Sequence, residues 1–418
     1  MTIPPFYGWF GDDFTGATDT LAMLAERGFR ALLFLGIPTP EQLASAGPLD
    51  AVGIAGATRS MPPTEMGPVL DAAGRFFAQL GVRIMHYKCC STFDSAPHVG
   101  NIGAAVAALR PHFPEGPISI IGGQPNLGRY CLFGHLFAAA GDGEVYRIDR
   151  HPTMSRHPVT PMVEADLRRH LGLQGFGSIS LVDYRALEGA GPANILDRDI
   201  ILFDVSRESD LTVIADRLRK SLDAAPGLFV GASSVARMAA QLLGGTGEPA
   251  ASQPVARSYG PVLALVGSLS PVTRAQVETA SGFAHLPVDA DRLRDEPSYG
   301  QTLSEQALEL LAVGDTMLVT RPPDGAPGDP HSVARETGRL MRRIMDRARI
   351  SRLVVAGGDT STLAIKALDI WGLSYRAPLV DGAPLCRTHS AVQQLDGLEV
   401  VLKGGQMGPV DFFQLASN

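Results

Sequence analysis

The stretch Gly11-Asp12-Asp13-Phe14-Thr15-Gly16-Ala17-Thr18-Asp19 follows an apolar run over residues 6–10 and precedes a segment with helical spacing. It therefore predicts a buried strand, a turn and a helix, which is the repeating step of an α/β fold. Three carboxylates crowd this stretch, although like charges repel one another and burial disfavours them. A helix N-cap, provided by Thr15 or Asp13, needs only one such residue. The crowding favours a site that holds a metal or a polyhydroxylated ligand, or that accepts a proton.

Length and composition indicate a folded protein of two or three domains, because the 418 residues are 45% hydrophobic and only 19% charged. The net charge of −7 argues against a nucleic-acid partner, which would favour a basic surface. No apolar run reaches the roughly 18 residues of a membrane span, and no basic segment precedes an apolar one at the N-terminus. We therefore expect no nucleic acid, no membrane and no signal peptide.

The cysteines fit neither a disulfide framework nor a zinc site. Cys89 and Cys90 are adjacent, whereas Cys131 and Cys386 stand alone in the sequence. Reduced thiols and a cytoplasmic location are the resulting expectations.

Apolar runs typical of short buried strands alternate with helical patterns along the chain. A segment rich in glycine, proline, serine and alanine interrupts the alternation at 244–260 and resembles a linker. Strands are expected at 31–36, 51–57, 82–88, 118–121, 179–182, 200–204, 228–230, 262–266, 316–320, 353–356 and 398–403, and helices at 63–80, 101–109, from 271, at 332–345 and at 363–368. This pattern predicts an α/β fold with two domains, 1–243 and 261–418, each a largely parallel sheet flanked by helices.

Three loops of the second half share one design. Residues 266–273, 356–362 and 403–408 each follow an apolar strand and are rich in glycine or hydroxyl side chains. Glycines let the backbone approach an anion, and free N–H groups at a helix N-terminus attract phosphate. One such loop is usually only a turn, but three in one domain favour a phosphate-binding site at the carboxyl edge of the sheet.

Polar clusters of the first half suit a different ligand. The stretch Lys88-Cys89-Cys90-Ser91-Thr92-Phe93-Asp94-Ser95 follows one expected strand, and Thr58-Arg59-Ser60 ends another. Cations beside hydroxyl groups suit a sugar acid, although a lysine at a strand end often only pairs with a surface acid. Standard P-loop, zinc-protease and hydrolase motifs are missing, and the G-x-G-x-x-A match at 245–250 lies in the expected linker.

These motifs together resemble the four-carbon acid sugar kinase family. The resemblance rests on the stretch 11–19, on 88–95 with Asn101-Ile102-Gly103, and on the three glycine loops, in the same order over essentially the whole chain. It implies an N-terminal domain for the sugar acid, a C-terminal domain for ATP, and an active site in the cleft between them. ATP and Mg²⁺ are the implied cofactors, the metal ligands are not identified, and a homodimer is left open.

Residue roles follow from these clusters and from the resemblance together. Asp12 and Asp13 are the catalytic candidates, one of them accepting the proton of the substrate hydroxyl. The candidate substrate-binding residues are Thr15, Asp19, Arg59, Lys88, Ser91, Thr92 and Asp94, with Arg59 and Lys88 expected to hold the substrate carboxylate. The candidate nucleotide-binding residues are Ser268, Ser270, Gly357, Gly358, Asp359, Thr360, Gly404 and Gly405.

Three segments depart from patterns that are usual in this family, those at 123–126 and 403–406 from the pattern of the oxotetronate kinases and the one at 231–234 from many members, which carry a further glycine. They are Gly-Gln-Pro-Asn at 123–126, Gly-Ala-Ser-Ser at 231–234 and Lys-Gly-Gly-Gln at 403–406. They indicate a separate branch, for which the expected function is phosphorylation of the terminal hydroxyl of 3-oxo-tetronate or of the branched 3-oxo-isoapionate in carbohydrate catabolism. A kinase for D-threonate or D-erythronate is an alternative.

Two other classes of protein stay open on the residues alone. A dehydrogenase or aldolase could act on similar acids, but a dehydrogenase would need a dinucleotide fingerprint where this chain has acidic residues that repel pyrophosphate. A non-catalytic sugar-acid sensor would not need the three glycine loops. Affinity for ATP separates these alternatives.

Overall fold

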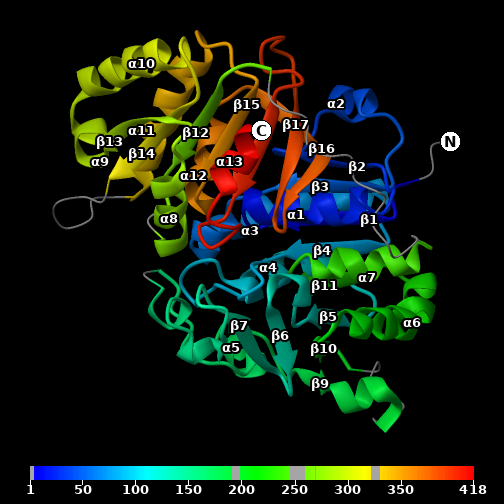
Figure 1. Cartoon of the computed structure of the whole chain (residues 1–418). Helices are drawn as coiled ribbons and strands as arrows, with labels where there is room; N and C mark the ends of the chain where they lie inside the picture. The colour runs from blue at the N-terminus through cyan, green and yellow to red at the C-terminus, as the bar shows by residue number, and fades with distance from the viewer. Residues whose placement is uncertain (1–3, 158, 191–197, 245–258, 269, 322–329) are drawn as a thin grey trace. The chain divides into compact units, whose positions relative to one another are not determined.

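A computed structural model describes residues 4–157, 159–190, 198–244, 259–268, 270–321 and 330–418 (Figure 1). The chain divides into two compact units, Met1–Ala251 and Ser252–Asn418. Each unit is an α/β domain with a mostly parallel sheet, so the predicted fold class is confirmed. The domain limits 1–243 and 261–418 stay predictions, because residues 245–258 of the expected linker lie outside the described ones.

Among its described residues, the first unit contains a parallel sheet of eight strands. Its order is β2-β3-β1-β4-β11-β5-β10-β9. The strands are β1 (Tyr7–Gly11), β2 (Ala31–Phe34), β3 (Ala51–Ala55), β4 (Ile84–Lys88), β5 (Ile118–Ile121), β9 (Ser180–Val182), β10 (Ile200–Phe203) and β11 (Gly227–Gly231). The central strands β1, β3, β4, β5 and β11 are buried along their whole length, which explains why they read as continuous apolar runs.

Helices cover both faces of this sheet. Right-handed crossovers place α1 on the face opposite to α3 and α4. Helix α1 packs against α7, and α7 against α6, while α3 packs against α4. The helices are α1 (Phe14–Ala25), α2 (Pro40–Ser45), α3 (Pro63–Leu80), α4 (Ile102–Leu109), α5 (Leu167–Gly172), α6 (Glu208–Ala224) and α7 (Ser234–Leu242).

A small antiparallel sheet is inserted between β5 and β9. Its order is β6-β7-β8, with strands Arg129–Leu132, His135–Ala139 and Val145–Arg147. The sequence had not predicted these strands. They are only partly buried, so they lack the continuous apolar runs that mark the strands of the large sheet.

The chain changes direction across the first sheet between β1 and β4. The connection after β1 leads to β2 on one side, and the connection after β4 leads to β5 on the other. Ligands of open α/β sheets bind outside the carboxyl ends of strands at such a switch point. The acidic stretch after β1 and the polar stretch after β4 both begin there.

The part of the second unit that the structure describes has a seven-stranded sheet with the same kind of switch point. Its order is β13-β14-β12-β15-β18-β17-β16, and the hairpin β16–β17 runs antiparallel. The strands are β12 (Val262–Val266), β13 (Ala284–Asp289), β14 (Thr316–Arg321), β15 (Arg352–Ala356), β16 (Ile370–Val380), β17 (Ala383–Ser390) and β18 (Glu399–Lys403). Here the chain leaves β12 towards β13 and leaves β15 in the opposite direction.

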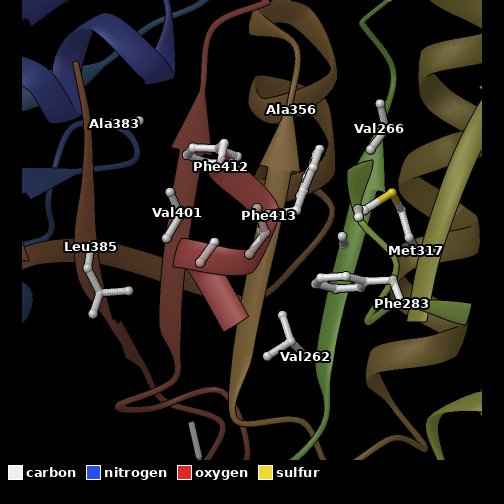
Figure 2. Packing of buried hydrophobic residues seen from close by; sticks show 14 of the residues in the cluster. Val262, Val266, Phe283, Met317, Ala356, Ala383, Leu385, Val401, Phe412 and Phe413 are labelled. Carbon is white, nitrogen blue, oxygen red and sulfur yellow. The ribbon is translucent and has the colours of Figure 1, made fainter. Parts of the chain in front are cut away.

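The helices of the second unit close its hydrophobic core. Phe412 and Phe413 of α13 lie over the sheet beside Val262, Ala356 and Val401, all of them buried (Figure 2). Helix α13 also packs against α8, while α9, α10 and α12 each pack against α11. The helices are α8 (Pro271–Thr279), α9 (Ala290–Asp295), α10 (Pro297–Leu311), α11 (Pro330–Met345), α12 (Gly358–Lys366) and α13 (Phe412–Ser417).

One expected helix has the wrong limits. The sequence predicted a loop up to Thr362 and a helix at 363–368, but α12 begins at Gly358. The glycine, serine and threonine residues that resembled a loop form its first turns. Among the described residues no helix is both long and apolar enough to cross a membrane.

The packing of Trp9 against Gly53 gives a test of the first sheet. A methyl group on Gly53 would lie 2.2 Å from the Trp9 ring, and both residues are buried. We expect Gly53→Ala to lower the free energy of unfolding of the first unit by about 1–3 kcal/mol, the usual cost of overpacking, as measured by urea denaturation. Gly172→Ala is the matched control, because this exposed residue has no atom within 4 Å of the added methyl group. Equal stability of the two variants would contradict the described contact.

Candidate functional site

Two buried carboxylates share one guanidinium group at the switch point of the first unit. Asp12 and Asp13 follow β1, and Arg59 lies in the short helical turn Thr58–Ser60 after β3. Arg59 Nη2 and Nε donate to Asp12 Oδ1 and Oδ2 at 2.8 and 3.0 Å, and Nη1 donates to Asp13 Oδ2 at 2.5 Å. Bidentate pairing of this kind is the strong form of an ion pair.

The electrostatics differ between the groups of this cluster. Burial raises the pKa of Asp12 above its ordinary value, although Arg59 opposes the shift. Burial alone would lower the pKa of Arg59, but the two carboxylates outweigh it and raise this pKa well above the usual range. Asp12 is therefore a stronger proton acceptor than an exposed aspartate, while Arg59 stays charged.

Asp13 also caps helix α1. Its Oδ1 accepts a hydrogen bond from the Gly16 N–H at 2.7 Å. The N-cap that the sequence left open between Thr15 and Asp13 is thus Asp13. The cap orients this carboxylate and leaves Asp12 as the one of the pair without a helix-capping role.

Lys88 completes the cluster from the end of β4. It is buried, and its Nζ donates to the Cys89 carbonyl at 2.6 Å. A Cβ on Gly16 would lie 2.6 Å from this Nζ and 2.8 Å from Asp13 Oδ1. Glycine at position 16 therefore lets the ammonium group approach the first turn of α1.

A second polar group lies in the turn after β4. Thr92 Oγ1 donates to Asp94 Oδ1 at 2.6 Å and lies 3.0 Å from Cys90 Sγ. Burial, followed by the charge of Asp94, raises the pKa of the Cys90 thiol. Arg59 and Lys88 also act on this thiol electrostatically, so Cys90 connects the two polar groups. Ser91 is half-buried in the same turn and makes no hydrogen bond within the described part of the chain.

Thr15 and Asp19 lie on buried positions of α1. Asp19 Oδ2 accepts a hydrogen bond from Gln124 Nε2 at 3.1 Å. Asp19 Oδ1 and Thr15 Oγ1 are buried without a hydrogen-bond partner among the described residues. Buried polar atoms without partners are uncommon in folded proteins, so both atoms mark places where a ligand could bind.

Arg129 is a cation near this region that the sequence analysis had not selected. It begins β6, and the charges of Cys90 and Asp94 act on it. Burial lowers the pKa of Arg129, and these two neighbours oppose the shift. The sequence offered one signal for Arg129, the polar segment that follows the apolar run 118–121. Such a segment does not indicate where the side chain of a residue several positions further along will lie.

The three glycine loops of the second unit come together at the carboxyl ends of β12, β15 and β18. The N–H groups of Gly267 and Ser268 donate to the Ala356 carbonyl at 3.0 and 3.1 Å. The Gly357 N–H donates to the Lys403 carbonyl at 2.8 Å. Gly357 has a φ of 128°, which strongly favours glycine. The main chain thus ties each loop to the neighbouring strand.

Hydroxyl groups join the first and third loops. Ser270 caps α8 by accepting a hydrogen bond from the Thr273 N–H at 3.1 Å, and its hydroxyl donates to the Gly405 carbonyl. Thr273 Oγ1 donates to the same carbonyl at 2.8 Å. A Cβ on Gly405 would lie 2.5 Å from Ser268 Oγ, so glycine is needed for this close approach. Gly404 precedes Gly405 in the third loop.

Lys403 lies beneath these loops and was not selected from the sequence. It is completely buried, and its Nζ donates to Gly404 O at 2.9 Å and to Thr273 Oγ1 at 3.1 Å. The Nζ lies 5.5 Å from the centre of the Phe412 ring. Burial lowers its pKa to about 7, and no carboxylate pairs with it among the described residues. Burial without a carboxylate partner disfavours the charged form of this lysine, which is the cause of the lowered pKa.

The remaining nucleotide candidates lie in the first turn of α12. These are Gly358, Asp359 and Thr360, and the side chains of the last two lie outside the described residues. Within the part of the chain that the structure describes, no group of three or more His, Cys, Asp and Glu side chains could hold a metal ion.

The Arg59 cluster generates a stability prediction. Replacing Arg59 by Met would leave two adjacent buried carboxylates without their shared cation, which typically costs about 3–5 kcal/mol for a broken buried pair. We expect Arg59→Met to lower the unfolding free energy of the first unit by an amount in this range at pH 7 in urea denaturation. Adding Asp12→Asn should restore part of it, because one of the two repelling charges is removed. A double variant no more stable than Arg59→Met would contradict the described pairing.

Comparisons with known proteins identify the families of the two domains. A model of sugar-binding N-terminal domains matches residues 7–239, and a model of nucleotide-binding C-terminal domains matches residues 263–413. A 3-oxo-isoapionate kinase of Paraburkholderia graminis is 40% identical over 97% of this chain and 92% of its own length. A 3-oxo-tetronate kinase of Burkholderia multivorans is 31% identical over 99% of this chain and 96% of its own length.

Solved structures resemble the whole chain as well. A Haemophilus influenzae protein has a TM-score of 0.69 and 26% identity and covers 98% of both chains. A protein of Salmonella typhimurium LT2 has a TM-score of 0.77 and 27% identity and covers 99% of this chain and 98% of its own. With both domain models matched and kinases among its full-length relatives, the chain belongs to the four-carbon acid sugar kinase family and is a phosphotransferase that uses an alcohol group as acceptor.

Proposed function

We propose that this enzyme transfers the terminal phosphoryl group of ATP to the primary hydroxyl of a small 3-oxo sugar acid in carbohydrate breakdown. The observation that carries the proposal is the pair of buried carboxylates held by Arg59 at the switch point of the sugar-binding domain. Phosphoryl transfer requires mainly positioning and charge stabilisation. A preorganised proton acceptor beside a surface that binds hydroxyl groups would position the substrate.

The branched 3-oxo-isoapionate is the preferred substrate in this proposal. The chain is 40% identical to a relative named for that substrate and 31% identical to one named for 3-oxo-tetronate, both over nearly the full length. D-Threonate and D-erythronate are the second candidates. They share the carboxylate and the terminal hydroxyl but lack the oxo group.

Asp12 is the proposed proton acceptor. The oxygen of the primary hydroxyl attacks the terminal phosphorus, the bond from that phosphorus to the bridging oxygen breaks, and ADP leaves. The hydroxyl proton passes to Asp12, whose pKa is raised by burial. Arg59 holds Asp12 in position, and Asp13 anchors the start of α1. Thr15, Asp19, Ser91, Thr92 and Asp94 are proposed to bind the substrate hydroxyls, and Lys88 the transferred phosphoryl group.

The loops around Lys403 are the proposed phosphate site for ATP. Backbone N–H groups at the N-termini of α8 and α12 suit an anion. Lys403 adds a buried positive charge behind them. Mg²⁺ is proposed to accompany the nucleotide, because in kinase sites this ion is held largely by the substrate phosphates, and it would neutralise the charge that develops during transfer.

The direct experiment measures ADP release with ATP and Mg²⁺ across a panel of acids. The panel contains 3-oxo-isoapionate, 3-oxo-tetronate, D-threonate and D-erythronate, with ATP alone as the control. A rate that depends on one acid identifies the substrate. No stimulation by any of them, with ATP still bound, would move the substrate outside this group.

Replacing Asp12 by Asn tests its role as proton acceptor. The amide keeps the size of the side chain but cannot take the proton, so kcat should fall by about 10²–10⁴-fold, the usual contribution of a general base. The KM for ATP should stay within about twofold. Asp13→Asn is the matched control, because its amide oxygen can still cap α1. It should lower kcat less than Asp12→Asn does, and the reverse order would assign the proton transfer to Asp13.

The pKa of Lys403 predicts how ATP binding depends on pH. The lowered pKa of about 7 means that the unbound lysine is charged below pH 7 and neutral above it. A bound phosphate favours the charged form, so affinity for ATP should weaken as pH rises from 7 to 8.5, by up to about tenfold per pH unit. Lys403→Met should bind ATP weakly and without this dependence. Parallel pH profiles of the two proteins in equilibrium titration would contradict the assignment.

A further inference from the structure

The sugar-binding domain must bind the carboxylate of its substrate, and this inference rests on the function proposed above. Three cations interact electrostatically with Cys90: Arg59, Lys88 and Arg129. Arg59 already makes three hydrogen bonds to two carboxylates. A further carboxylate beside it would meet two buried negative charges, which would repel it.

Lys88 is also a poor partner for the substrate carboxylate. Its Nζ lies against the first turn of α1, and the Asp13 carboxylate lies close by. This places its charge beside the proposed proton acceptor, where the reacting hydroxyl must bind. The carboxylate of a sugar acid is separated from its terminal hydroxyl by the length of the carbon chain, so one ammonium group cannot serve both ends.

Arg129 has an unused donor within the part of the chain that the structure describes. Its Nη1 donates to the Leu127 carbonyl. Its Nε is buried without a hydrogen-bond partner among the described residues. The Nε and Nη2 atoms form the edge of a guanidinium group that binds a carboxylate through two parallel hydrogen bonds.

The backbone around Arg129 is firmly held. Gln124 N–H donates to the Arg129 carbonyl at 2.9 Å, and Arg129 N–H donates back to the Gln124 carbonyl at 3.2 Å. The Gln124 side chain joins this turn to Asp19 of α1. Gly128 completes the turn with a φ of 69°. The base of the Arg129 side chain is therefore fixed relative to the helix that follows Asp12 and Asp13.

A buried donor without a partner costs about 1–3 kcal/mol, and no carboxylate lies within ion-pair distance of Arg129 among the described residues. Asp94 attracts it only from further away. Asn126, in the same turn, also has a buried Oδ1 without a partner in the described part of the chain. Two unsatisfied groups in one turn, one a donor and one an acceptor, indicate a polar ligand.

We propose that Arg129 binds the carboxylate of the sugar acid through its Nε and Nη2 atoms, and that it makes the enzyme specific for acids. Asn126 Oδ1 accepts a hydrogen bond from a hydroxyl group at the same end of the substrate. The roles of the three cations are then separate: Arg59 positions the proton acceptor, Lys88 serves the reacting end, and Arg129 serves the carboxylate end. This replaces the expectation that Arg59 and Lys88 hold the carboxylate.

The test compares an acid with its uncharged analogue. Initial rates are measured for 3-oxo-isoapionate and for its primary amide, which keeps the shape but lacks the charge. The wild-type enzyme should prefer the acid by about 100-fold or more in kcat/KM, as expected for two charge-assisted hydrogen bonds. Arg129→Gln should lose this preference because kcat/KM falls for the acid and stays similar for the amide. The KM for ATP should not change.

Two further variants control for folding and for general loss of charge. Arg129→Lys keeps the charge without the two-atom edge and should retain part of the preference. Arg147→Gln removes an exposed arginine that pairs with Asp149 and should behave as wild type. Equal losses for acid and amide in both Arg129 variants would overturn the proposal and leave a structural role, as would an unchanged preference. A wild-type enzyme that neither phosphorylates nor binds any sugar acid of the panel would overturn the proposed function itself.

Discussion

Two carboxylates buried side by side repel each other and are unstable without a shared cation. In the sugar-binding domain Arg59 is that cation for Asp12 and Asp13. Arg59 reaches Asp12 and Asp13 only because the end of β3 lies against the end of β1, where the Gly56 N–H donates to the Gly11 carbonyl at 2.8 Å and the Arg59 N–H to the Asp12 carbonyl at 3.2 Å. The parallel register of these strands therefore determines that Arg59 pairs with the two carboxylates. The pairing with Arg59 lowers the pKa of Asp12 and so opposes the rise that burial causes.

The second domain has the same kind of switch point but the opposite arrangement of charge. Its three glycine loops meet at the switch point between β12 and β15, with Lys403 buried beneath them. In the first domain a cation neutralises fixed negative charges, whereas in the second a buried cation has no carboxylate partner among the described residues. Sites built on the ends of rigid parallel strands hold such groups in place without a bound ligand.

Much of this could be predicted from the sequence, and the failures have physical causes. Strands buried on both faces are continuous apolar runs, so β5 and β12 were predicted with their observed limits. The hairpin β16–β17 was missed because its register shifts and its partly exposed positions break any regular pattern. Asp12, Asp13, Arg59 and Lys88 were grouped correctly as neighbours because each ends a strand or follows one. Arg129 and Lys403 were missed because burial and tertiary contacts single them out, which sequence spacing does not reveal.

The position of Trp9 has a consequence for how the protein can be observed. The chain contains two tryptophans, Trp9 in β1 of the first unit and Trp371 in β16 of the second. Trp9 is completely buried against Gly53, whereas Trp371 is half-buried beside His389. Their fluorescence should therefore differ in wavelength and in accessibility to quenchers. Each domain carries its own optical signal, and single-tryptophan variants would reveal whether the two domains unfold in one step or in two.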